Sequence, residues 1–153
     1  MTSAAAGDRF RAAARAYFGY AIVYWVGGVY LVSQGVGIPG PITPFRRVTY
    51  VAFWALAGLV PMLAIPYLLR RPRAWFERWI LSRRDFARIL ALFMAWRAIE
   101  TLRVVLRPVT STVPAPWGGE ISFRTGAVLF VIVTAVALAL VARAAWADRE
   151  ELA

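Results

Sequence analysis

The chain has no cysteine and no histidine, and only eight of its 153 residues are acidic. The lack of cysteine excludes disulfides and thiolate nucleophiles, and the lack of histidine excludes Ser-His catalysis and histidine-ligated haem or chlorophyll. Without either residue type, the usual ligand sets of zinc are absent too. The sequence contains no glycine-rich phosphate loop and no nucleophile elbow. It therefore predicts no enzyme, with no catalytic, cofactor-binding or metal-binding residues.

Lysine is also missing, so that all 18 basic residues are arginines and the net charge is +10. In a soluble protein this charge would indicate a nucleic-acid partner. Here the arginines flank long apolar runs, as they do in membrane proteins, and 61% of the residues are hydrophobic. We therefore expect an all-α polytopic membrane protein that contacts anionic lipid headgroups and no nucleic acid.

Four runs are long enough to cross about 30 Å of hydrocarbon as helices. The spans are expected at residues 16–34, 48–69, 86–106 and 125–146 of a single membrane domain. Proline and glycine separate them, and Pro61 and Pro66 are expected to kink the second. The remaining segments are an amphipathic surface helix at 1–15, a basic amphipathic connector at 70–85, an irregular periplasmic loop at 108–124 and a tail at 147–153.

The arginines also predict how the chain is oriented in the membrane. With the N-terminus inside, eleven arginines of the termini and the second loop lie in the cytoplasm and four lie outside. The positive-inside rule then favours cytoplasmic positions for both termini. The preference for arginine over lysine indicates a GC-rich, bacterial genome, so we expect the bacterial inner membrane.

The connector holds the densest group of arginines, interleaved with Trp75, Phe76 and Trp79. Aromatic rings of this kind favour the membrane interface, and guanidinium groups bind anionic headgroups. The residues expected to contact anionic lipid are Arg70, Arg71, Arg73, Arg78, Arg83 and Arg84.

The third span differs from the others because it carries charge in its middle. Its ten Leu, Ile, Phe and Val residues contribute about −3 to −6 kcal/mol to insertion, whereas each central charge costs about +2.5 to +3.5 kcal/mol. Arg97 and Glu100 are central, so they cancel the apolar gain. This segment should cross only if its charged side is covered; the alternative is a long surface helix over residues 75–106 that never crosses.

At about 100° per residue, Arg97, Glu100, Arg103 and Arg107 fall within an arc of roughly 120° on one side of this helix. Arg97 and Arg103 each lie three residues from Glu100, so one carboxylate could pair with two guanidiniums. We interpret these four residues as an intramembrane charge site that contacts a partner or ligand.

Two functions fit such a site. The first is a non-catalytic accessory or assembly subunit of a larger inner-membrane complex (respiratory, photosynthetic or transport) that docks through the charged helix face and aromatic surfaces. The alternative is a small homo-oligomeric channel or transporter in which Arg97 and Glu100 line a polar path. A lipid-modifying enzyme would need Glu100 or Glu120 as its base and is the least favoured of the three.

Overall fold

A computed structural model describes residues 2–79, 81–107 and 110–146 of the chain. The described part is mostly helical, in agreement with the predicted fold class. The predicted tail at 147–153 lies outside the described residues. In chain order the elements are α1 (Thr2–Ser33), α2 (Pro44–Leu69), α3 (Arg73–Phe76), α4 (Arg83–Leu106), β1 (Thr112–Pro114), β2 (Glu120–Ser122) and α5 (Phe123–Trp146).

Helix α1 is continuous over 32 residues and so differs from the surface helix and separate span expected at 1–15 and 16–34. The reason is local, because alanine and arginine are strong helix formers and run without interruption through the expected junction at residue 15. The helix ends before Gly35 and Gly37, whose φ angles are +87° and +78°. Glycine adopts these left-handed conformations without the penalty that a side chain would bring.

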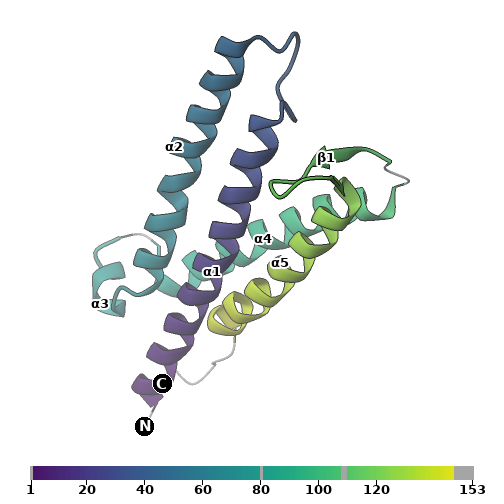
Figure 1. Ribbon diagram of the computed structural model, residues 1–153. Helices are drawn as coiled ribbons and strands as arrows, with labels where there is room; N and C mark the ends of the chain where they lie inside the picture. Colours follow the sequence, from purple (N-terminus) through teal and green to yellow (C-terminus); the bar gives the residue numbers. More distant parts are fainter. Residues whose placement is uncertain (1, 80, 108–109, 147–153) are drawn as a thin grey trace.

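Two helical hairpins form the molecule, α1 with α2 and α4 with α5, and α1 packs against α5 to join them. Figure 1 shows the hairpins crossing at an angle and diverging away from the end where α1 begins and α5 finishes. Fifteen buried hydrophobic residues make up the core near that end, among them Phe10, Leu69, Met94 and Val141. Only Leu69 of these fifteen belongs to α2, which leaves α2 the most exposed of the long helices.

Trp25 sets the close approach of α1 and α2. Its indole Nε1 donates a hydrogen bond to the carbonyl oxygen of Ala55, 2.8 Å away on α2. A Cβ atom at Gly58 would lie 2.8 Å from Cδ1 of the same indole ring, closer than real Cβ contacts allow. Glycine at this position therefore gives the tryptophan room to lie against the α2 backbone.

The segment expected as an irregular loop at 108–124 contains a short antiparallel hairpin instead. Strand β1 pairs with β2, with Val113 opposite Ile121. Gly118 and Gly119 have φ angles of +95° and +80° and close the turn. The Tyr30 hydroxyl donates a hydrogen bond to the Pro114 carbonyl oxygen, so the hairpin is held against the far end of α1.

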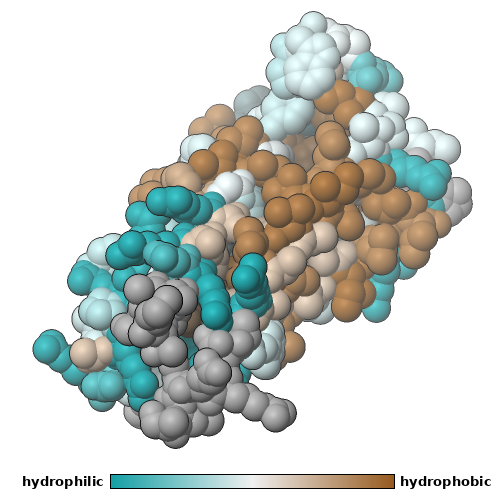
Figure 2. All heavy atoms as spheres, turned by 90° about the horizontal axis from the view of Figure 1, so that it is seen from below, coloured by the Kyte–Doolittle hydropathy of each residue, from teal (hydrophilic) through white to brown (hydrophobic). Residues whose placement is uncertain are grey.

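Among the described residues, three helical stretches are long and apolar enough to cross a membrane, namely Gly7–Ser33, Pro44–Leu69 and Phe123–Trp146. Figure 2 shows a hydrophobic band across the middle of one face, with hydrophilic residues gathered mostly at one end of it. Helix α4 is not among the three because even its least charged 18-residue window, 89–106, contains Arg97, Glu100 and Arg103. The chain is thus a helical protein with the properties of a membrane protein, and three of its helices satisfy the criteria for a span.

The chain from the start of α4 to the β-hairpin nevertheless contacts α1 at two well-separated positions. At the start of α4, the guanidinium of Arg83 lies 4.0 Å above the centre of the Phe10 ring. Beyond its end, the β-hairpin is bound to Tyr30. Phe10 and Tyr30 are 20 residues apart on one helix, which corresponds to about 30 Å at 1.5 Å per residue. Between Arg83 and the hairpin, the chain therefore covers a distance along α1 that is close to the thickness of a bilayer's hydrocarbon core.

Candidate functional site

A side-chain cap fixes the start of α4. The Ser82 hydroxyl accepts a hydrogen bond from the Asp85 backbone N–H at 3.1 Å and donates one to the Asp85 carboxylate at 2.6 Å. This residue pattern is a common N-cap, and a carboxylate in the first turn also interacts favourably with the helix dipole. The Ser82 hydrogen bond lowers the pKa of Asp85, and Arg88 contributes to the same shift through an ion pair of 2.9 Å.

One face of α4 is buried in the core and carries only uncharged residues. These residues are Ala87, Leu90, Ala91 and Met94. The opposite face is exposed and holds large apolar side chains that are 42–74% accessible, namely Ile89, Leu92, Phe93, Trp96, Ile99, Leu102 and Leu106. Such a face is suited to hydrocarbon or to another protein rather than to water.

Arg97 lies at the border between these two faces. Its Nη2 atom donates a hydrogen bond to the Tyr24 hydroxyl on α1 at 3.2 Å, and the guanidinium carbon is 5.2 Å from the Tyr24 ring centre. The Nε atom of Arg97 is buried and has no hydrogen-bond partner among the described residues. A buried donor without a partner has a free-energy cost, so this guanidinium is only partly satisfied by its own chain.

Glu100 and Arg103 form an ion pair of 2.6 Å on the exposed face of α4. Their side chains are 39% and 60% accessible, respectively. Arg107 follows at the end of the helix and is also exposed. The carboxylate is therefore not shared between two guanidiniums as the spacing had suggested, because within the described part of the chain Arg97 turns toward Tyr24 instead.

The predicted charge site is thus divided in two. Arg97 faces inward to an aromatic cluster, whereas Glu100, Arg103 and Arg107 lie on the outer side of α4 with Trp96 and Ile99. None of the described residues of the chain covers the Glu100–Arg103 pair completely. The pair occupies the last third of a 24-residue helix, flanked by apolar side chains.

The aromatic cluster beside Arg97 is centred on Tyr24. Ring centres lie 5.7 Å from it at Phe130 of α5, 6.0 Å at Trp54 of α2 and 6.1 Å at Tyr20 of α1. With Arg97 of α4 included, Tyr24 contacts side chains of α1, α2, α4 and α5, which are the four long helices. These contacts are ordinary packing contacts within the chain.

The six arginines predicted to bind lipid do not form one uniform surface. Arg70, Arg73 and Arg78 are exposed, whereas Arg71, Arg83 and Arg84 are partly buried. Arg71 lies 4.1 Å above the Tyr67 ring, and Arg83 donates a hydrogen bond to the Arg71 carbonyl oxygen at 3.2 Å. Among the described residues of the connector, only the single turn of α3 (Arg73–Phe76) and the start of α4, from Arg83, are helical.

Helical spacing alone could not reveal two features of this region. One is the Tyr24 hydroxyl as the partner of Arg97, since the two residues are 73 positions apart. The other is an apolar groove between α1 and α5, which depends on how these helices pair. The unusual number of aromatic residues in α1 was the only sequence signal that pointed toward Tyr24 as the partner of Arg97.

The fold and the site define a small helical protein of membrane type, with a polar link inside the bundle and an ion pair on its outer surface. The described residues contain no group of three or more acidic residues that could hold a metal ion. Comparison with family models, curated proteins and solved structures finds no match to this chain. The functional conclusion therefore rests on the geometry of the site.

Proposed function

We propose that the protein is a non-catalytic accessory or assembly subunit of a larger complex in the bacterial inner membrane. It docks onto its partner through the exposed face of α4, where Glu100 and Arg103 pair among apolar side chains. The complex would be respiratory, photosynthetic or involved in transport. The observation that carries this proposal is the incompletely covered Glu100–Arg103 pair on α4, a helix that starts beside Phe10 of α1 and leads to a hairpin beside Tyr30.

The first step of the proposal is that α4 crosses the membrane as a fourth span. Its start lies beside Phe10 and the hairpin after it lies beside Tyr30, at the two ends of the apolar helix α1. Helix α5 then returns antiparallel to α4, and its Ala144 belongs to the same core cluster as Phe10. If α1 and α5 both cross, α4 must cross too, which supports four spans and termini on the same side.

The second step concerns the free energy of the ion pair. A charged side chain costs at most about 2.5–3.5 kcal/mol on insertion scales, the value at the centre of a span, and pairing lowers this cost only in part. Long arginine side chains can reach an interface, but the shorter Glu100 cannot follow as far. A partner that covers this face and supplies hydrogen bonds would remove the cost, so the exposed face of α4 is best explained as a docking surface.

The third step concerns orientation in the membrane. Arginine is concentrated at the end of the bundle where α1 begins and α3 lies, which supports placing that end in the cytoplasm.

The fourth step concerns small-molecule binding. The groove between α1 and α5 has a volume of about 240 Å³, below the roughly 300–1,000 Å³ of typical small-molecule sites. A docking role requires no such site.

Neutralising the ion pair tests the proposal. The double variant Glu100→Gln with Arg103→Gln is compared with Asp8→Asn and Arg11→Gln, which remove a pair with the same three-residue spacing from a solvent-exposed position. Each protein is extracted from its own membranes in mild detergent and weighed by native mass spectrometry. The wild type and the Asp8/Arg11 variant are expected to carry the same partner subunits at fixed stoichiometry, and the Glu100/Arg103 variant to lose them.

Two results would count against an accessory subunit. If the wild type is found alone and monomeric in repeated preparations, the docking proposal is wrong. If it forms only a homo-oligomer, the channel or transporter becomes the better explanation. In that case flux measured in liposomes should disappear in Arg97→Leu and Glu100→Gln.

A further inference from the structure

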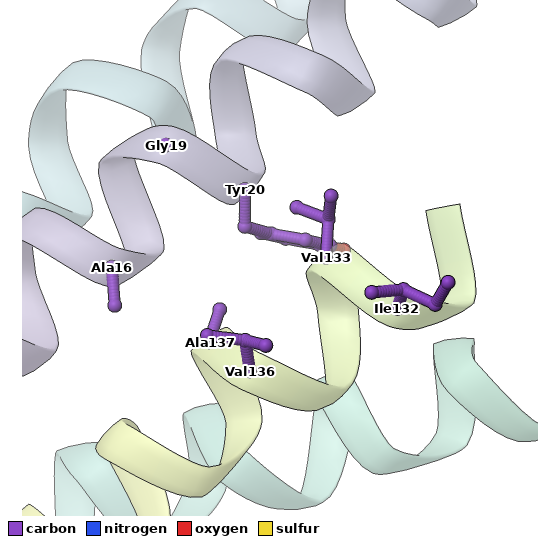
Figure 3. A pocket seen from close by; sticks show the side chains of 7 residues that line it. All are labelled: Ala16, Gly19, Tyr20, Ile132, Val133, Val136 and Ala137. Carbon is purple, nitrogen blue, oxygen red and sulfur yellow. The ribbon is translucent and has the colours of Figure 1, made fainter. Parts of the chain in front are cut away.

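A shallow groove of about 240 Å³ lies between α1 and α5 (Figure 3). Its lining is almost entirely apolar and comes from only these two helices. The residues that line it are Ala16, Gly19, Tyr20, Ile132, Val133, Val136 and Ala137.

Small residues on α1 create the groove. Gly19 has no side chain, and a Cβ atom built there would meet no atom within 4 Å. Tyr20 is buried and its ring packs 5.6 Å from that of Phe130, so it forms the floor instead of filling the space. Ile132 and Val136 are exposed on the other wall. The groove is therefore open along its length to whatever surrounds the bundle, which for apolar spans is lipid.

One end of the groove is basic. Arg9 precedes Ala16 by seven residues, and Arg143 follows Val136 by seven. Seven residues are two helical turns, so each arginine lies on the groove side of its helix about 10 Å beyond the lining. Because α1 and α5 are antiparallel, both arginines are at the same end of the groove, where α1 begins and α5 finishes (Figure 1).

We propose that this groove binds one acyl chain of an anionic phospholipid, with the net negative headgroup held at Arg143. An apolar groove on a membrane-spanning pair of helices suits an acyl chain, and guanidinium groups form strong charge-assisted hydrogen bonds with phosphate. Arg143 is exposed, so its guanidinium is accessible to a headgroup.

Native mass spectrometry with defined lipids tests the site. The full-length protein is delipidated in detergent and then incubated with phosphatidylglycerol or phosphatidylcholine of identical acyl chains. The wild type is expected to retain one phosphatidylglycerol about fivefold more strongly than phosphatidylcholine, since one arginine near an anionic headgroup adds an attraction of that order. Arg143→Gln should reduce phosphatidylglycerol retention to the level of phosphatidylcholine.

Filling the groove separates the acyl-chain contact from the charge. Gly19→Leu should reduce retention of both lipids, because the added side chain meets open space rather than protein. The matched controls are Gly7→Leu, about 180° around α1 from Ala16 and also in open space, and Arg124→Gln at the opposite end of α5. Neither control should change the retention of either lipid.

Three outcomes would overturn the lipid site: equal retention of the two lipids by the wild type, unchanged phosphatidylglycerol binding by Arg143→Gln, or unchanged binding by Gly19→Leu. Loss of a partner subunit in Gly19→Leu with normal lipid retention would show instead that a protein fills the groove. None of these results depends on the docking face of α4, so the two proposals can fail separately.

Discussion

Arg97 of α4 donates its hydrogen bond to the hydroxyl of Tyr24 of α1, with 3.2 Å between the two atoms. The same tyrosine ring packs against Trp54 of α2 and Phe130 of α5. Tyr24 thereby links both helical hairpins. Arg97 thus faces into the bundle, where this hydroxyl satisfies part of its guanidinium, whereas the neighbouring Glu100–Arg103 pair faces outward.

Removing the hydroxyl should weaken this link without changing the aromatic packing. In Tyr24→Phe the ring remains, but the Arg97 guanidinium loses the hydroxyl that accepts its hydrogen bond. We expect a loss of about 1–2 kcal/mol in the free energy of unfolding, measured by thermal or denaturant unfolding in detergent. Tyr50→Phe is the control, because the Tyr50 hydroxyl has no hydrogen-bond partner among the described residues; an equal effect of both variants would contradict the role of Tyr24.

The two interface glycines of the α1–α2 pair should respond differently to alanine. At Gly58 the new Cβ atom would lie 2.8 Å from Cδ1 of Trp25, so the indole must move and strain its hydrogen bond to Ala55. We expect Gly58→Ala to destabilise the protein by about 1–3 kcal/mol in the same unfolding assay.

Gly28→Ala serves as the matched control for this substitution. Its Cβ atom would lie 3.5 Å from the Trp54 ring, an ordinary van der Waals distance. Because alanine favours a helix over glycine by about 0.5–1 kcal/mol, this variant should be neutral or slightly more stable. Tolerance of alanine at Gly58 would mean that the close approach of Trp25 to α2 does not hold.

Single cysteines can test whether α4 crosses the membrane, since the chain has no cysteine of its own. Trp117 in the β-hairpin and Phe45 at the start of α2 are 80% and 81% exposed, and Ala74 in α3 is also exposed. An impermeant maleimide added to intact cells should label Trp117→Cys and Phe45→Cys, and should label Ala74→Cys only after the membrane is opened. Labelling of Trp117→Cys and Ala74→Cys from the same side would show that α4 does not cross.

Several features of the fold could be predicted from the sequence because they depend on local composition. Long uncharged runs bounded by proline and glycine indicated a helical membrane protein, and α1, α2 and α5 contain such runs. The continuity of α1 was missed because charged residues near its start indicated a surface segment, although alanine-rich sequence favours one helix. The β-hairpin was missed because its prolines and glycines are equally typical of an irregular loop.

The site could be predicted only in part. Helical spacing correctly places Arg103 within reach of Glu100, but it cannot show that Arg97 prefers a hydroxyl 73 residues earlier in the chain. That preference depends on the packing of α1 beside α4. The groove at Gly19 likewise depends on the pairing of α1 with α5, which no periodicity along one segment reveals.

The central claim is that protein, rather than lipid, covers the outer face of α4 in the native membrane. Ile99 lies next to Glu100 on this face and is 53% exposed, whereas Val60 is 67% exposed on α2 and serves as the control. A photo-crosslinking amino acid at each position, activated in native membranes, tests the claim most directly. The account predicts a protein crosslink from position 99 and only lipid adducts from position 60; only lipid adducts from position 99 would contradict it.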